Sequence, residues 1–216
     1  MSQEKITSKG SQTRERIVAA AAGLMLEFGA HDTTLDDIKS ASRVSSSQLY
    51  HYFDDKQAIV RAVISFQTTA IVAPQEVLLK DLSTVDGLRS WRDFVVEMQH
   101  ELNFKGGCPI GGLGSEFAEV DLQIREDVLT SFVRWEQAIA RGLSNMQVLG
   151  RLPASADPQR LALALLTALQ GGLLLCKVQR TTAAMEVALD AVIAHIDALS
   201  ASSSEADLGA SLAMNK

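Results

Sequence analysis

The sequence has few cysteines, prolines and aromatic residues. Its 216 residues include two cysteines and four prolines, and aromatic side chains make up 5%. Cys108 and Cys176 are too few and too far apart for a disulfide framework or a zinc site, which indicates a reducing compartment. The low proline content excludes collagen-like and proline-rich disordered chains. We therefore expect a globular, cytoplasmic protein that holds no metal and no other cofactor.

The sequence also lacks an excess of positive charge. It has 20 Lys and Arg residues against 26 Asp and Glu residues, which gives a formal net charge of −6. Phosphate binding depends on Lys and Arg, so this balance speaks against a strongly basic nucleic-acid-binding protein. The acidic excess, however, lies entirely after Arg61, because residues 1–61 contain eight basic and eight acidic side chains. The first part of the chain can therefore still form a DNA-binding domain of modest charge.

No apolar run is long enough to cross a membrane with ease. Ile17–Leu26 follows basic residues but lacks the cleavage site of a signal peptide. Leu161–Cys176 is shorter than the roughly 20 residues of a spanning helix, and it contains Gln170. We expect this second run to be a helix buried in a core or a subunit interface, in a protein without a membrane partner.

Helical periodicity dominates the rest of the sequence, and no run alternates as a strand does. In the first predicted helix, Gln12–Phe28, apolar residues recur at helical spacing, and Gly29 follows as a natural end. The sequence therefore predicts an all-α fold. The further predicted helices are Leu35–Ser42, Ser46–Phe53, one that begins near Lys56, Val85–Asn103, Leu113–Glu119, Leu122–Met146, Pro158–Val178 and Ala183–Leu199.

Two short helices joined by the turn Arg43–Ser45, with a longer helix before them, are typical of a helix-turn-helix unit. The second helix of such a unit presents its N-terminal residues to base edges in the major groove. Gln48 can bond an adenine through both its oxygen and its nitrogen. The residues expected at the base edges are Ser45, Ser46, Ser47 and Gln48.

Other side chains of this unit are expected at the phosphates. Tyr50 and His51 point to the phosphates or the base rim, while Leu49 and Phe53 turn inward. Lys56 and Thr34 each stand where a helix begins, and the free N–H groups of a helix N-terminus attract phosphate. Simple core packing is the alternative for Tyr50 and Tyr52, and an ordinary solvated lysine is the alternative for Lys56.

Thr34–Ile38, Val44-Ser45 and the run Leu49–Lys56 together resemble the DNA-binding domain of TetR/AcrR-family transcriptional regulators. The resemblance extends from Thr13 to about Val63. It implies backbone contacts by Thr34, Tyr50, His51 and Lys56 and base contacts by Ser46–Gln48. It also implies a ligand-responsive regulator, usually a repressor, that binds a palindromic operator as a homodimer. Arg43 departs from the family, which often has Gly in this turn, so either Arg43 adopts a left-handed backbone or the turn adjusts.

These patterns predict three segments: a DNA-binding domain over 1–61, a sensing and dimerising domain over 62–200 and a disordered tail over 201–216. The last two helices are apolar nearly all round, which is typical of helices packed between their own core and a second subunit. A monomer's core helix is the alternative. The predicted interface residues are Leu165, Leu169, Gly172, Val187, Ala191 and Ala194.

The middle of the chain gathers both tryptophans with Met and Phe residues, as small-molecule pockets do. We expect a small, apolar effector there, although most of these residues must simply be core. The segment Gly107–Leu113 with Ser115-Glu116 is similar to the LmrA/YxaF-like branch of the family, and Cys108 is either a thiol sensor or a small packed residue. The predicted ligand contacts are Trp91, Val95, Met98, Phe117, Phe132 and Trp135.

The motifs of common enzymes are missing. The sequence has no Gly-x-Ser-x-Gly, Walker loop, dinucleotide fingerprint, Cys-x-x-Cys or His-Glu-x-x-His, and its four histidines are scattered. A helical hydrolase or lipid carrier would leave the run Leu49–Lys56 unexplained, so we expect no enzyme. The remaining alternative is a helical ligand-binding dimer that acts through protein contacts without operator specificity.

Overall fold

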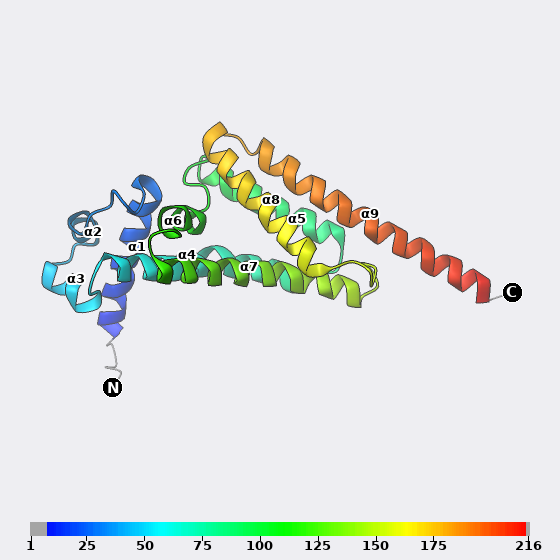
Figure 1. Ribbon diagram of the computed structural model, residues 1–216, viewed down its shortest axis with the longest axis horizontal. Helices are drawn as coiled ribbons and strands as arrows, with labels where there is room; N and C mark the ends of the chain where they lie inside the picture. Colours follow the sequence, from blue (N-terminus) through cyan, green and yellow to red (C-terminus); the bar gives the residue numbers. More distant parts are fainter. Residues whose placement is uncertain (1–7, 215–216) are drawn as a thin grey trace. The chain divides into compact units, whose positions relative to one another are not determined.

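The computed structural model describes residues 8–214, and over this range all regular secondary structure is helical (Figure 1). The predicted all-α fold is confirmed. Residues 1–7 and 215–216 lie outside the described residues, so the last two residues of the predicted tail are not described. The helices are α1 Ser8–Phe28, α2 Leu35–Ser42, α3 Ser46–Tyr52, α4 Lys56–Lys80, α5 Val85–Glu101, α6 Pro109–Phe117, α7 Leu122–Val148, α8 Pro158–Gln179 and α9 Ala183–Met214.

The described chain forms two compact units. Unit 1 contains residues 8–70 and 109–131, and unit 2 contains residues 71–108 and 132–214. The sequence prediction places 109–131 in the second domain, whereas the structure groups this segment with the first helices. Long-range bonds explain the grouping: Arg61 Nε donates to Asp127 Oδ2 at 2.7 Å, and Thr68 Oγ1 donates to Ser131 Oγ at 2.7 Å.

The core of unit 1 is built from the inward faces of its short helices. Ile38, Leu49, Phe53 and Ile59 are all buried, as their helical spacing predicts. α1 adds a buried stripe that includes Ile17. Burial of these side chains fixes the angle at which α3 leaves α2, and therefore which residues of α3 face outward.

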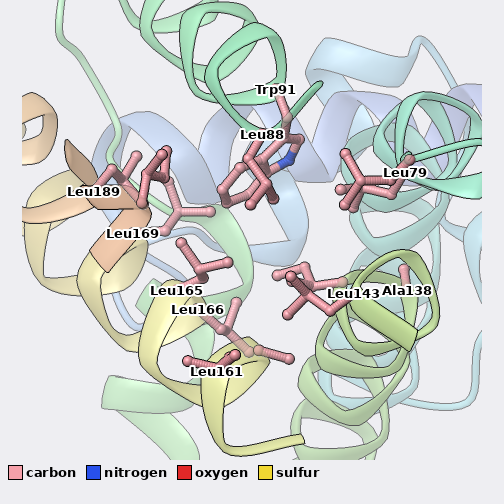
Figure 2. Packing of buried hydrophobic residues seen from close by; sticks show 14 of the residues in the cluster. Leu79, Leu88, Trp91, Ala138, Leu143, Leu161, Leu165, Leu166, Leu169 and Leu189 are labelled. Atoms are coloured by element: carbon pink, nitrogen blue, oxygen red, sulfur yellow. The ribbon is translucent and has the colours of Figure 1, made fainter. Parts of the chain in front are cut away.

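Unit 2 has a larger core, in which leucines from several helices pack near Trp91 (Figure 2). Trp135 is buried in the same cluster. Polar bonds complete this core, because Gln75 Oε1 accepts from the indole N–H of Trp91 at 2.9 Å and of Trp135 at 3.0 Å. At the surface, Arg89 and Arg92 of α5 form ion pairs with Asp197 and Asp190 of α9. α9 is therefore held to α5 by charge as well as by apolar packing.

Three helix boundaries differ clearly from the prediction. α1 begins at Ser8 rather than at Gln12. α6 begins at Pro109 rather than near Leu113, although the segment is rich in glycine. Burial of Ile110 and Leu113 outweighs the low helix propensity of its glycines. α9 continues to Met214, beyond the predicted end at Leu199. The structure thus assigns helix where the sequence predicts a disordered tail, and disorder over 201–216 stays a prediction for limited proteolysis to test.

By length and composition alone, α4 and α8 could each cross a membrane. Both helices, however, supply core residues, such as Val72 and Leu79 from α4 and Leu165 and Leu169 from α8. Buried helices of globular proteins can be as long and as apolar as membrane-spanning helices. Two helices of this length and composition are therefore weak evidence for a membrane span.

Candidate nucleic-acid interface

The N-terminus of α2 is closed by a reciprocal cap. Thr34 Oγ1 accepts from the N–H of Asp37 at 3.1 Å, and the Thr34 N–H donates to Asp37 Oδ2 at 2.9 Å. The Thr34 hydroxyl also donates to Asp37 Oδ2 at 2.5 Å, and these bonds lower the pKa of Asp37. Both donors of Thr34 are thus engaged with Asp37. Thr34 is exposed, but it has no spare donor for a phosphate unless the cap opens.

The turn between α2 and α3 contains a strained arginine. Arg43 has φ 53° and ψ 48°, which is the left-handed conformation, and its N–H donates to Ser40 O at 3.2 Å. Of the two possibilities for this position, the first therefore holds: arginine accepts the conformation for which glycine is suited. The exposed side chain adds a positive charge between the two helices.

Replacing Arg43 by Gly is expected to raise the free energy of unfolding by about 0.5–1 kcal/mol. Relief of the left-handed strain, about 1–2 kcal/mol, outweighs the extra freedom of glycine in the unfolded chain. Urea unfolding measures the change, and Arg43→Ala is the matched control, since it removes the same charge but keeps the strain. Equal stability of the Gly and Ala variants would contradict the explanation.

α3 begins with a second reciprocal cap, at the residues predicted to read bases. Ser45 Oγ accepts from the N–H of Gln48 at 3.2 Å, and Gln48 Oε1 accepts from the N–H of Ser45 at 3.0 Å. The side-chain oxygen of Gln48 is therefore occupied within its own helix. The predicted two-bond contact with adenine needs that oxygen, so in this conformation only the Nε2 group of Gln48 can donate to a base.

The serines of α3 also have intramolecular partners. Ser45 Oγ and Ser47 Oγ are 3.1 Å apart, and Ser46 Oγ accepts from Lys39 Nζ at 3.0 Å. All three serines are exposed. Lys39 also pairs with Asp36 at 2.5 Å, and it places a cation directly beside the start of α3. The sequence interpretation missed Lys39, although its position one turn before the end of α2 was visible.

The C-terminal half of α3 divides its side chains as predicted. Leu49 is buried and Tyr50 is 55% exposed, so core packing does not account for Tyr50. His51 is exposed, and Tyr52 is half-buried with its ring at 4.8 Å from that of His51 in an edge-to-face arrangement. Tyr50 and His51 therefore lie on the solvent side of α3, where a phosphate can reach them.

Two arginines of α1 have structural partners. Arg16 Nε donates to Ser42 O at 2.8 Å, at the C-terminus of α2. The guanidinium of Arg14 lies over the ring of Phe53, 5.1 Å from its centroid. These cations stabilise the helix-turn-helix unit, and only their remaining donors are available to DNA.

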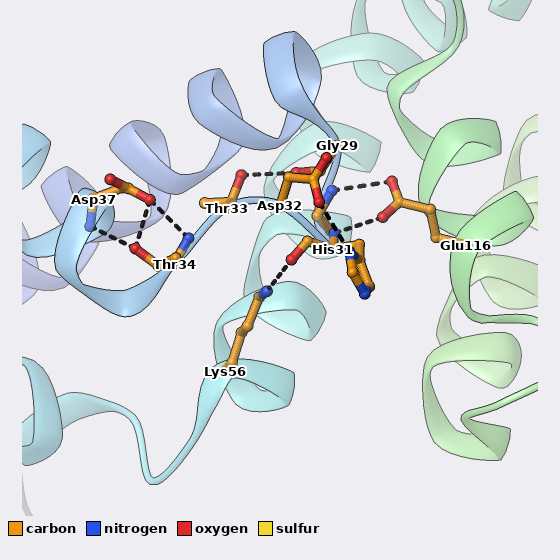
Figure 3. Close-up of polar contacts among 9 residues, drawn as sticks. Gly29, His31, Asp32, Thr33, Thr34, Asp37, Lys56 and Glu116 are labelled. Carbon is orange, nitrogen blue, oxygen red and sulfur yellow. Dashed lines mark hydrogen bonds and ion pairs between the residues drawn. The ribbon is translucent and has the colours of Figure 1, made fainter.

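Lys56, the first residue of α4, binds the turn between α1 and α2 (Figure 3). Its Nζ donates to His31 O at 3.0 Å. On the same turn, the backbone N–H groups of Ala30 and His31 donate to the carboxylate of Glu116 at 3.0 and 2.7 Å. Glu116 belongs to α6, and the sequence offered no signal for this contact because 85 residues separate it from His31. The ammonium of Lys56 keeps donors for a phosphate, since it has three.

The residues predicted to contact an effector differ in burial. Trp91, Val95 and Trp135 are buried in the core of unit 2, whereas Met98 and Phe132 are half-buried. Phe117 belongs to unit 1. Cys108, predicted to be either a thiol sensor or a small packed residue, is half-buried directly before α6. The other cysteine, Cys176, is buried, and burial raises the pKa of its thiol.

A separate open cavity of about 270 Å³ lies in unit 2. Its walls come from the start of α5, the end of α7 and the residues of α9 around Asp197. The cavity carries the Asp86–Arg89–Asp197 ion pairs, which makes its wall polar. It contains none of the predicted ligand contacts. In the described part of the chain, no group of His, Cys, Asp and Glu side chains is arranged so that it could hold a metal ion.

Three of the predicted interface residues of α8 are buried within the single chain. Leu165, Leu169 and Gly172 are buried in their own unit, and a Cβ on Gly172 would lie 2.6 Å from the Cα of Met185. These residues therefore pack α8 against α9 within one chain. The opposite faces of both helices carry exposed, mostly apolar side chains. On α8 these are Leu163, Thr167, Leu174 and Val178, and on α9 they are Val187, Ala191, Ala194 and Ala198.

Two family models match the chain. Residues 17–63 match the family described as bacterial regulatory proteins, tetR family. Residues 84–192 match the tetracyclin repressor-like C-terminal domain, which covers half of the chain. The first match contains the helix-turn-helix unit, and the second contains most of unit 2 together with α6.

Individual proteins give the same result. An uncharacterized HTH-type transcriptional regulator in the lacX 3' region of Lactococcus lactis subsp. lactis is 28% identical over 186 residues, which cover 82% of this chain and 90% of that protein. The transcriptional regulator AcuR of Cereibacter sphaeroides is 27% identical over 171 residues, 78% of each chain. The crystal structure of regulatory protein TetR from Rhodobacter sphaeroides superposes with a TM-score of 0.75 and 25% identity, covering 85% of this chain and 98% of that one.

Proposed function

The chain belongs to the tetR family of bacterial regulatory proteins, and from this premise we propose that it represses transcription by binding a palindromic operator as a homodimer. A small-molecule effector would release it. The chain is a transcriptional regulator and not an enzyme, as are its relatives. TetR-family regulators bind DNA and act as dimers with small-molecule effectors; the operator, the interface and the effector of this protein are our proposals. Its place of action would be the cytoplasm, where bacterial DNA lies.

The observation that carries the proposal is the division of α3 into two faces. Leu49 is buried, while Ser46, Ser47, Gln48, Tyr50 and His51 are all exposed. Every exposed member of this set can donate a hydrogen bond. A row of donors on a rigid, capped helix suits the acceptor-rich major groove and its phosphates.

Three cations support phosphate contact around this helix. Lys39 lies beside its first residue, Arg43 is exposed in the preceding turn, and Lys56 stands at the start of α4. With Tyr50 and His51 they form the proposed backbone-binding set. Because these contacts release counterions, affinity should fall steeply with salt concentration. Thr34 joins the set only after its cap opens, because a phosphate accepts hydrogen bonds and both donors of Thr34 are engaged with Asp37.

The proposed dimer interface is the exposed stripe on α8 and α9. Leu174 and Val178 of α8 and Val187 of α9 are each more than 60% exposed. The stripe carries no charged side chain among its eight residues, which favours burial against a second copy. A two-fold interface would place one α3 in each of two half-sites about one DNA turn apart.

The proposed effector site is the part of unit 2 around Met98 and Phe132. These two predicted contacts are only half-buried, so a ligand can reach them without breaking the core, whereas Trp91 and Trp135 are already bonded to Gln75. A ligand must bind the DNA-free state more tightly to release the operator. A ligand-binding dimer without operator specificity is the second candidate, and selection of duplexes from a random pool by the wild-type protein separates the two.

Variants of Gln48 test base reading by α3. Gln48→Glu keeps the oxygen that caps α3 but loses the Nε2 donor, so its unfolding free energy should stay within about 0.5 kcal/mol of the wild type. Its preference at one operator position should relax, with roughly tenfold or greater loss of affinity for the preferred base. Sequence selection and fluorescence anisotropy measure both effects.

Gln48→Ala and Tyr50→Ala are the controls. Gln48→Ala loses the Nε2 donor and also the oxygen that caps α3. Loss of the cap should lower its free energy of unfolding by about 1 kcal/mol. Tyr50→Ala should lower affinity on all sequences alike, because phosphate contacts carry no base preference. An unchanged preferred sequence for both Gln48 variants would remove Gln48 from the base-reading set.

A further inference from the structure

The turn between α1 and α2 forms a cradle for an anion. Gly29 ends α1 in the left-handed region, with φ +85°. The next two backbone N–H groups, of Ala30 and His31, converge on one carboxylate (Figure 3). Successive N–H groups after such a residue make a concavity that binds anions. Its occupant is Glu116 of α6: Oε1 accepts from Ala30 at 3.0 Å and Oε2 accepts from His31 at 2.7 Å.

The same turn touches both helices that begin at predicted phosphate contacts. Lys56 Nζ donates to His31 O at 3.0 Å, and α4 begins at Lys56. Thr33 Oγ1 donates to Gly29 O at 2.7 Å, directly before Thr34, which caps α2. Movement of this turn would therefore displace the start of α2 and the ammonium of Lys56 together.

Glu116 supplies the acceptors that the turn needs. Ala30 is completely buried, so its N–H has no access to water, and an unmade bond at a buried N–H is costly. A carboxylate satisfies both N–H groups at once, and charge-assisted bonds of this kind are stronger than neutral ones. No other side chain of the described residues is bonded to these two N–H groups.

We propose that Glu116 is a positioning residue for DNA binding, which holds the Gly29–His31 turn and thereby places Lys56 and the N-terminus of α2 for the phosphates. This inference rests on the proposed function in DNA binding. The direction of its effect is informative. If Glu116 acted only as a surface charge, it would repel DNA, and its removal would strengthen DNA binding. If Glu116 positions the turn, its removal weakens DNA binding.

The test compares Glu116→Ala and Glu116→Gln with Glu119→Gln, on the duplex that the wild-type protein selects from a random pool. Glu119 is exposed just after α6, and its side chain has no hydrogen bond or ion pair with the described residues, so its variant removes the same charge without disturbing the turn. Glu116→Ala is expected to lower affinity roughly tenfold, Glu116→Gln less, because it keeps one acceptor, and Glu119→Gln not at all.

The salt dependence of affinity separates this role from a loss of folding stability, which would not change the slope. If Glu116 acts through Lys56, the slope of log affinity against log salt should fall by about one in Glu116→Ala, as in Lys56→Ala. The double variant should then bind little more weakly than Lys56→Ala alone. Thermal unfolding confirms that each variant is folded, and Glu116→Gln keeps the test open if Glu116→Ala does not fold.

Amide hydrogen exchange checks the contact without DNA. The N–H groups of Ala30 and His31 should be protected in the wild type and in Glu119→Gln, and should exchange faster in Glu116→Ala. The proposal would be overturned if folded Glu116→Ala kept the affinity and the salt slope of the wild type. It would also be overturned if Glu116→Ala bound DNA as tightly as Glu119→Gln does. A wild-type protein that binds no DNA would instead overturn the proposed function, and hydrogen exchange would still report on the cradle.

Discussion

Leu174→Glu is expected to convert the dimer into a monomer and to lower operator affinity roughly a hundredfold or more. Leu174 is 63% exposed in the middle of the stripe on α8, so the change costs the single chain little. In a two-fold interface the introduced carboxylate occurs twice and would be buried without a partner. Operator affinity falls because the two half-sites are then bound by separate monomers instead of by one linked dimer. Linking two binding units raises affinity about 10²–10⁴-fold.

Sedimentation velocity and anisotropy on the same samples measure this prediction. Val148→Glu is the matched control, because Val148 is 85% exposed and lies at the end of α7, outside the stripe. It should leave both the dimer and the affinity unchanged. A Leu174→Glu protein that stays dimeric would place the interface elsewhere. A monomer with wild-type affinity would show that paired half-sites are not used.

Gln75→Leu is expected to lower the free energy of unfolding by roughly 3–5 kcal/mol. Gln75 is 1% exposed, and its single oxygen accepts from the indole N–H groups of Trp91 and Trp135. The substitution leaves two buried donors without a partner, at about 1–3 kcal/mol each. Repacking around a side chain of different shape adds a smaller cost.

Urea unfolding followed by fluorescence suits this prediction, since Trp91 and Trp135 are the two tryptophans of the chain. A double-mutant cycle supplies the control. In a Trp91→Phe, Trp135→Phe background, followed by circular dichroism, Gln75→Leu should cost less than half as much, because no indole N–H remains to be satisfied. An equal cost in both backgrounds would mean that Gln75 acts by packing rather than by accepting these bonds.

Local signals in the sequence were sufficient for the helix-turn-helix unit. α2 was predicted at its observed bounds because Thr34 is a strong N-cap and acidic residues follow it in the first turn. The inward set Ile38, Leu49, Phe53 and Ile59 followed from helical spacing and is buried. The reciprocal cap from Ser45 to Gln48 was also readable as a Ser-x-x-Gln pattern, and it would have corrected the predicted adenine contact.

Longer-range features could not be predicted because they depend on tertiary partners. α8 is apolar nearly all round, so its periodicity does not tell which stripe faces its own core, and Leu165 and Leu169, predicted at the interface, are buried in unit 2. The glycines of α6 argued against a helix that burial of Ile110 and Leu113 stabilises. Glu116 accepts hydrogen bonds from backbone N–H groups. Nearly every residue has such a group, so the sequence does not indicate which ones Glu116 contacts.

Selection of duplexes from a random pool by the purified wild-type protein tests whether α3 reads DNA in a two-fold pair. We expect enrichment of a palindrome whose half-sites lie about one helical turn apart, and loss of that enrichment in Leu174→Glu. Footprinting should then find the same sequence in the promoter beside the protein's own gene. Enrichment of no palindrome, with wild-type protein shown to be folded and dimeric, would contradict the claim and leave a helical dimer that acts through protein contacts.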